Sequence, residues 1–111
     1  YPRYGSLVGR AVASGDAELG VAVCGSGQGI SMAVNKVPGA RGAVIHYPLE
    51  AEMTRRHNNA NVACFGERFT TEFVAQRSLE VFLATPFDGG RHTHRVDQLT
   101  LLDQTHGKAE I

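Results

Sequence analysis

The stretch from Leu19 to Ser31 most narrowly limits the folds open to this chain. A short apolar run, Leu19–Cys24, ends in a cysteine, and three alternating glycines follow before the sequence takes on helical character. A nearly continuous apolar run is typical of a strand in a parallel sheet that is covered on both faces. The pattern therefore predicts a strand, a tight turn and a helix, with a thiol where the strand meets the turn.

The same alternation continues along the chain. We expect further strands at Gly42–Ile45 and Asn61–Phe65, because both are short apolar runs bounded by turn residues. Helical segments separate the strands in the order αβαβαβαα. We therefore predict an α/β fold, a Rossmann-like three-layer sandwich with a parallel sheet. Three strands are few for such a sheet, so we expect the Leu19–Cys24 strand to lack a neighbour within this chain.

The helices are placed by spacing, caps and breakers. The expected segments are one with Leu7, Val8, Ala11 and Val12 on one side, then residues 29–36, residues 48–56, a long helix capped by Thr70 or Thr71 and broken at Pro86, and a last helix carrying Val96, Leu99 and Leu102.

Size and composition indicate one domain over residues 1–111. The sequence opens on Tyr1 without an initiator methionine, so we expect either a fragment that is incomplete at its N-terminus or a processed product. A net charge of zero gives no general attraction to nucleic acid or to an anionic membrane. No apolar run reaches the roughly 20 residues of a membrane span. Two cysteines in unlike surroundings make no disulfide framework. We expect a cytoplasmic protein that binds neither nucleic acid nor membrane.

The glycine loop Gly25-Ser26-Gly27-Gln28-Gly29 leaves backbone N–H groups free at a helix start, where they can hold an anion or a developing oxyanion. The same position can lower the pKa of Cys24. The dinucleotide, P-loop and cysteine phosphatase signatures each fail at a required residue, the first and last of them at Ile30. Two interpretations stay open: a reactive thiol beside an anion site, and a tight turn with a structural cysteine. Cys64 is expected in the core.

His57 lies at the end of a helix and before a strand, so within one subunit it is expected on the opposite rim of the sheet from Cys24. It either caps its helix or serves the site of a neighbouring subunit. Arg91 and Arg95 are one helical turn apart and can grip a phosphate together, or they form a solvated basic face.

His92-x-His94 resembles half of a metal site. Residues two apart diverge on a helix, and we expect no cysteine or carboxylate to complete the set. We therefore expect no metal and no other cofactor. Arg68, two residues after the third strand, is either a polar ligand or a surface charge.

Several motifs in a fixed order resemble the type B ribose-5-phosphate isomerases, a family that includes galactose-6-phosphate and allose-6-phosphate isomerases. The resemblance runs from Tyr1 to about Leu102. Its motifs are Val23–Ser31, Asn35-Lys36-Val37-Pro38-Gly39, Arg56-His57-Asn58 followed by Asn61-Val62, and Gly89-Gly90-Arg91-His92 followed by Arg95-Val96.

The resemblance implies a metal-free aldose–ketose isomerisation of a phosphosugar through an enediolate. Cys24 resembles the base, and Ser26 with the loop glycines resembles the anion hole. His57 resembles the residue that opens the sugar ring. The substrate-binding positions implied by the resemblance are Tyr1, Gly25, Gly27, Gly29, Asn58, Arg68, Arg91 and Arg95.

The family builds its site between two subunits, so the resemblance implies a homodimer or homotetramer in which His57 faces the partner's cysteine. It also implies a strand, a helix and a second strand ahead of Tyr1, and the missing strand would cover the Leu19–Cys24 edge. We expect a ribose 5-phosphate isomerase. The alternatives are an isomerase of allose or galactose 6-phosphate, a non-catalytic phosphosugar-binding partner subunit, and a nucleotide-binding module.

Overall fold

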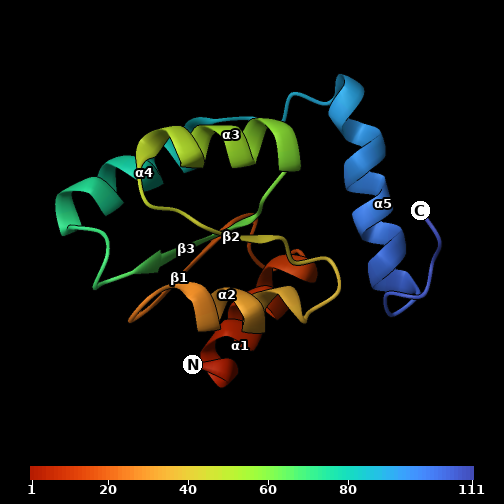
Figure 1. Cartoon of the computed structure of the whole chain (residues 1–111), viewed down its shortest axis with the longest axis horizontal. Helices are drawn as coiled ribbons and strands as arrows, with labels where there is room; N and C mark the ends of the chain where they lie inside the picture. The colour runs from red at the N-terminus through yellow and green to blue at the C-terminus, as the bar shows by residue number, and fades with distance from the viewer.

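The structure is a computed structural model that describes every residue from 1 to 111. Three parallel strands form one sheet, and helices lie on both of its faces (Figure 1). The predicted α/β architecture is confirmed. The strands are β1 (Gly20–Cys24), β2 (Gly42–Val44) and β3 (Val62–Gly66), and the helices are α1 (Pro2–Ala13), α2 (Gln28–Asn35), α3 (Pro48–Asn58), α4 (Glu72–Ala84) and α5 (Thr93–Gln104), with a short 3-10 helix, η1 (Gly90–His92), before α5.

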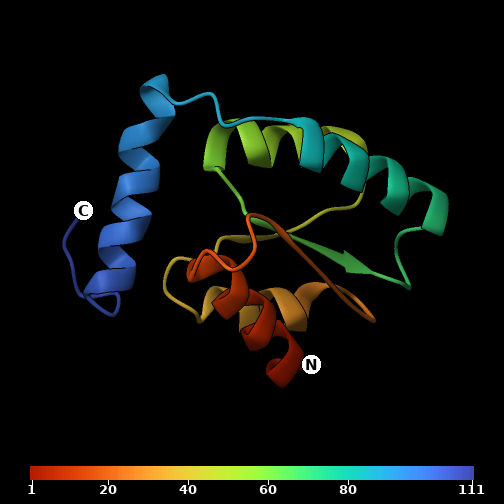
Figure 2. The same ribbon diagram turned by 180° about the vertical axis from the view of Figure 1, so that it is seen from behind.

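β3 is the central strand of the sheet, whose order is β1-β3-β2. All of its residues are buried, as expected for a strand with a neighbour on each edge and helices on each face. Its side chains alternate between two cores. Val62 and Cys64 pack with residues of α1 and α2, whereas Ala63 and Phe65 pack with residues of α3 and α4. β3 therefore joins the two halves of the hydrophobic core. Figure 2 shows the helices on the two sides of the sheet.

The prediction that the first strand lacks a neighbour within the chain is wrong. β1 pairs with β3 along its whole length, from Gly20 opposite Val62 to Cys24 opposite Gly66. The expectation of burial on both faces is also wrong, because Val21 and Val23 remain 40% and 56% exposed. β3 takes the centre of the sheet, so β1 is an edge strand. Its Val21 and Val23 line a pocket together with Ala75 and Leu79 of α4, which leaves both valines partly exposed.

α5 lies beside the sheet, at the end from which the strands start, and not over either face (Figures 1 and 2). Val96 is the buried residue of α5. The carboxylate of Asp103 accepts a hydrogen bond of 2.8 Å from the N–H of Gly39, which ties α5 to the turn before β2. None of the helices combines the length and the apolar character that a membrane crossing requires.

The loop after β1 packs directly against the end of β3. Gly27 has a φ of 79°, in the left-handed region that favours glycine, and it starts α2 as the N-cap. Gly66 lies so close to the backbone of Ser26 that a β-carbon at Gly66 would overlap it. The N–H of Glu67 also donates to the carbonyl of Cys24 at 3.0 Å. The position of the loop therefore depends on Gly66, which is 40 residues after Ser26 and has no side chain to keep the two backbones apart.

Substituting Gly66→Ala should lower the free energy of unfolding by about 1–3 kcal/mol, because the two backbone segments must separate to admit the methyl group. Urea denaturation of the two proteins measures the difference. Gly25→Ala is the control, since a β-carbon at Gly25 meets only the mobile end of the Arg68 side chain, 3.1 Å away at Cζ. Equal stability losses in the two variants would contradict this account of the Gly66 contact.

Candidate active site

Cys24 is the last residue of β1, and its sulfur lies against the backbone at the start of α2. The N–H of Gly27 donates a hydrogen bond of 3.2 Å to Sγ. The N–H of Gln28 donates to the Ser26 hydroxyl, also at 3.2 Å. The thiol, a hydroxyl and the first amides of a helix are therefore gathered in one turn of chain. Such a turn can hold a negative charge.

The backbone amides lower the pKa of the Cys24 thiol. The amide of Ile30 contributes most, partial burial opposes it, and the amides of Ser26, Gly27 and Gly29 add to the lowering. Hydrogen bonds to the charged form stabilise the thiolate relative to the thiol. This geometry favours the reactive thiol over the structural one.

Cys64 has the opposite environment. It is fully buried in β3, and that burial raises its pKa to about 11. The thiol of Cys64 therefore stays protonated at neutral pH, as expected for a core cysteine.

Two further side chains lie over the glycine loop. A β-carbon placed on Gly29 would be 2.7 Å from Cε1 and Cζ of Tyr1, and one placed on Gly25 would be 3.1 Å from Cζ of Arg68. The phenol and the guanidinium therefore occupy space that side chains at these glycines would take. The N–H of Arg68 also donates to the carbonyl of Gly25 at 3.0 Å. The structure thus brings Tyr1 and Arg68 to the loop that contains Cys24.

The remaining predicted site residues lie at the other end of the sheet. α3 ends beside α5, where the chain enters β3, whereas Cys24 lies where β1 ends (Figures 1 and 2). His57 and Asn58 close α3, Arg91 lies in η1, and Arg95 lies in the first turn of α5. The structure therefore separates the cysteine from His57 within one chain.

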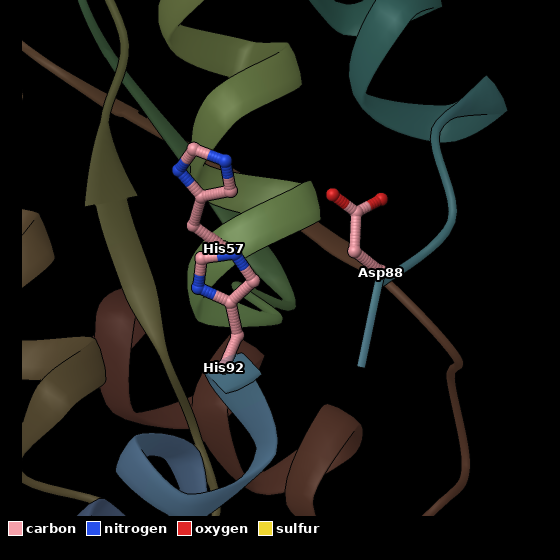
Figure 3. Close-up of side chains that lie close together, drawn as sticks. All are labelled: His57, Asp88 and His92. Atoms are coloured by element: carbon pink, nitrogen blue, oxygen red, sulfur yellow. The ribbon is translucent and has the colours of Figure 1, made fainter. Parts of the chain in front are cut away.

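His57 is stacked on His92 at this second end, with ring centroids 4.4 Å apart and ring planes 16° apart (Figure 3). Burial, with smaller contributions from His57 and Arg91, lowers the pKa of His92. The guanidinium groups of Arg91 and Arg95 form no ion pair in the structure. Exposed, unpaired guanidinium groups are available to an anion.

Sequence reasoning missed the partners of this histidine stack. Asp88 lies beside the two rings, and its carboxylate accepts a hydrogen bond of 3.1 Å from Nη1 of Arg56. Asn58 also borders a cavity of about 380 Å³ between α3 and α5, with Arg41, Leu99 and Asp103 among its lining residues. Asp88 is 31 residues after His57, and no local pattern connects the two.

Comparison with known proteins identifies the class of this α/β chain. A family model described as Ribose/Galactose Isomerase matches residues 1–99. The chain is 40% identical over 104 residues to ribose-5-phosphate isomerase B of Escherichia coli, covering 94% of this chain and 70% of that protein. The chain therefore belongs to the ribose/galactose isomerase family, and the resemblance found in the sequence motifs is confirmed.

Solved structures agree with this assignment. The type B ribose 5-phosphate isomerase of Trypanosoma cruzi superposes with a TM-score of 0.93 at 44% identity, covering 96% of this chain and 71% of that one. Ribose-5-phosphate isomerase B of Clostridium thermocellum gives the same TM-score at 40% identity and covers 96% and 72% of the two chains. The Mycoplasma genitalium enzyme, at 36% identity over 94% of this chain and 69% of its own, was solved with bound ribulose-5-phosphate.

The lowered pKa of Cys24 gives a direct prediction. Alkylation by iodoacetamide should reach half of its maximal rate at a pH below the ordinary thiol value of about 8.5, because the thiolate is the nucleophile. Labelling reactions quenched at fixed times and analysed by mass spectrometry measure the dependence of the alkylation rate on pH. In the Cys24→Ser variant, only Cys64 is left, and it should react after denaturation but not in the folded protein. A profile centred at or above the ordinary value would contradict the proposed amide–sulfur contacts.

Proposed function

We propose that this protein interconverts ribose 5-phosphate and ribulose 5-phosphate through an enediolate. The observation that supports this most is the convergence of backbone amides on the sulfur of Cys24. Proton abstraction next to a carbonyl needs a base and a stabilised oxyanion at adjacent positions. The loop offers both within a few residues. Membership of an isomerase family makes this chemistry the appropriate one to assign.

In this proposal the Cys24 thiolate removes the proton from carbon 2 of the open-chain aldose. The electron pair of the broken C–H bond forms the enediolate, and the negative charge moves to the oxygen on carbon 1. The thiol then returns the proton to carbon 1, and the carbon 2 hydroxyl transfers its proton to the neighbouring oxygen to give the ketose. The amides of Gly25, Gly27 and Gly29 and the Ser26 hydroxyl stabilise the charged oxygen. A single such donor is typically worth about 10²–10³ in rate.

The side chains around the two clusters suggest the other roles. Tyr1 and Arg68 lie over the loop and can contact the sugar hydroxyls. Arg91 and Arg95 are exposed cations suited to the phosphate, which orients the reacting carbons from a distance. We assign ring opening to His57 and hydroxyl binding to Asn58. No part of this cycle requires a metal or another cofactor.

The separation of the two clusters supports a shared site. A two-fold axis places each residue of one subunit against a different residue of the other, so the cysteine edge of one chain can meet the histidine edge of its partner. We therefore propose a homodimer, or a homotetramer built from it, with two sites that each use both chains. In this arrangement His57 acts on the substrate held at the Cys24 of the partner.

A second substrate class deserves a direct comparison, because the chain is also 39% identical over 87 residues to galactose-6-phosphate isomerase subunit LacB of Clostridium acetobutylicum, which it covers over 50% of its length. The same loop chemistry applies to an aldose with one more carbon. Initial rates with ribose 5-phosphate, allose 6-phosphate and galactose 6-phosphate decide between them. We expect the highest kcat/KM with ribose 5-phosphate.

Replacing the base should abolish turnover while leaving binding intact. We expect Cys24→Ala to lower kcat by at least about 10²-fold with little change in KM, because only the proton transfer is lost. Formation of ribulose 5-phosphate, followed by absorbance, measures both constants. Cys64→Ala is the matched control and should keep the rate of the parent protein. Full activity in Cys24→Ala would rule out this base, and an inactive parent chain would favour the non-catalytic partner subunit.

Mixing two inactive variants tests the shared site. Cys24→Ala and His57→Ala chains, unfolded together and refolded in equal amounts, should recover about a quarter of the parent activity, because half of the dimers are mixed and each mixed dimer has one intact site. Each variant refolded separately provides the baseline. Activity that stays at this baseline, with mixed dimers shown by mass spectrometry, would place the whole site within one chain.

A further inference from the structure

We propose that His57, Asp88 and His92 form a binding site for a borderline divalent transition-metal cation such as Zn²⁺ or Co²⁺. One ligand atom from each residue lies within 4.8 Å of the other two. The three side chains come from the end of α3, the loop after α4 and η1, and they meet beside one another (Figure 3). The histidine pair considered in the sequence, His92-x-His94, is not the pair that meets. The fold instead brings His57, from the end of α3, to His92 and to Asp88, which is four residues before His92.

The carboxylate is already positioned for a cation. Nη1 of Arg56 donates to Oδ1 of Asp88 at 3.1 Å, and Nε of Arg56 donates to Glu52 at 2.8 Å, which fixes the guanidinium. The N–H of Asp88 also donates to the carbonyl of Arg56 at 3.1 Å. Oδ2 of Asp88 has no partner in the structure. One oxygen therefore holds the loop to α3, and the other is left for a ligand. Ligands supported in this way bind metal more tightly than free ones.

The donor set selects the class of cation. Two imidazoles and one carboxylate suit Zn²⁺, Co²⁺, Ni²⁺ and Cu²⁺, whereas Mg²⁺ and Ca²⁺ prefer oxygen ligands. Both imidazoles must be neutral to coordinate the cation, so binding should weaken as the pH falls. The positive charges of Arg91 and Arg95 oppose a cation, so we expect weaker affinity than that of a structural zinc site.

The stacked rings must rearrange on binding. A metal ion lies near the plane of each imidazole that coordinates it. The planes of the two stacked rings are only 16° apart, so no position within bonding distance of both rings lies in both planes. One ring must therefore turn about its Cβ–Cγ bond to bring a nitrogen to the ion. Metal binding breaks the His57–His92 stack and, whichever ring turns, ties a nitrogen of His57 to the ion. If the proposed function is correct, the cation then inhibits isomerisation by withdrawing the ring-opening histidine.

Binding is measured without substrate, on the full chain treated with chelator and transferred to buffer free of metal. Addition of Co²⁺ should produce visible d–d absorption that saturates near one equivalent, and Zn²⁺ should abolish it by competition. We expect His92→Ala and Asp88→Asn to weaken Co²⁺ binding more than about tenfold. His94→Ala is the matched control, because His94 is in the same segment and outside the cluster, and it should bind like the parent protein.

Two outcomes would overturn the site: no saturable Co²⁺ spectrum, or one that His92→Ala leaves unchanged. Thermal denaturation of each variant without metal shows whether it is folded. Asp88→Asn, which keeps the shape of the side chain, provides the test if His92→Ala is not folded.

Inhibition is measured separately, as isomerase activity against Zn²⁺ concentration in the parent and His94→Ala proteins. Binding without inhibition would preserve the metal site and reject its effect on His57, whereas the absence of any isomerase activity would reject the proposed function and leave the binding result standing.

Discussion

The contact between the Cys24 sulfur and the amides at the start of α2 is the interaction on which the proposed chemistry depends. It combines two effects that a loop rarely supplies together. The amides stabilise a thiolate, and they lie where an enediolate oxygen would develop its charge. Neither effect needs a metal, because oriented peptide dipoles provide the positive potential. The glycines make this possible by leaving the amides open to a ligand.

That loop is held in place by the central strand, not by its own sequence. Gly66 admits the backbone of Ser26 at the end of β3, and the amides of Glu67 and Arg68 donate to the carbonyls of Cys24 and Gly25. β3 is fully buried between two cores, so its end is a rigid support. The turn after the edge strand β1 is therefore held in place by contacts with the buried central strand.

The glycine loop with Cys24 and the cluster with His57 lie at opposite ends of the sheet. One chain therefore presents two separate groups of the proposed site residues. In a parallel sheet, each connecting helix carries the chain back to the edge where the strands begin. The last residues of such a helix therefore lie at the edge opposite the one where the strands end. His57 is placed there by the same connection rule that builds the sheet. A second chain can then bring His57 to the thiol, so in our proposal catalysis and association are coupled by topology.

Local sequence determined the strands and helices and pointed to Cys24 as the candidate catalytic residue. The order of strands and helices follows from apolar runs, glycines and prolines, and Cys24 stood out because a thiol at a strand–turn–helix junction is a local pattern. The tertiary structure decided which strand lies at the centre, and it left β1 at an edge with Val21 and Val23 partly exposed. It also decided that Asp88 meets His57 and His92. Strand order and such contacts depend on the relative burial of distant segments, which is a property of the packed chain and not of any short window of sequence.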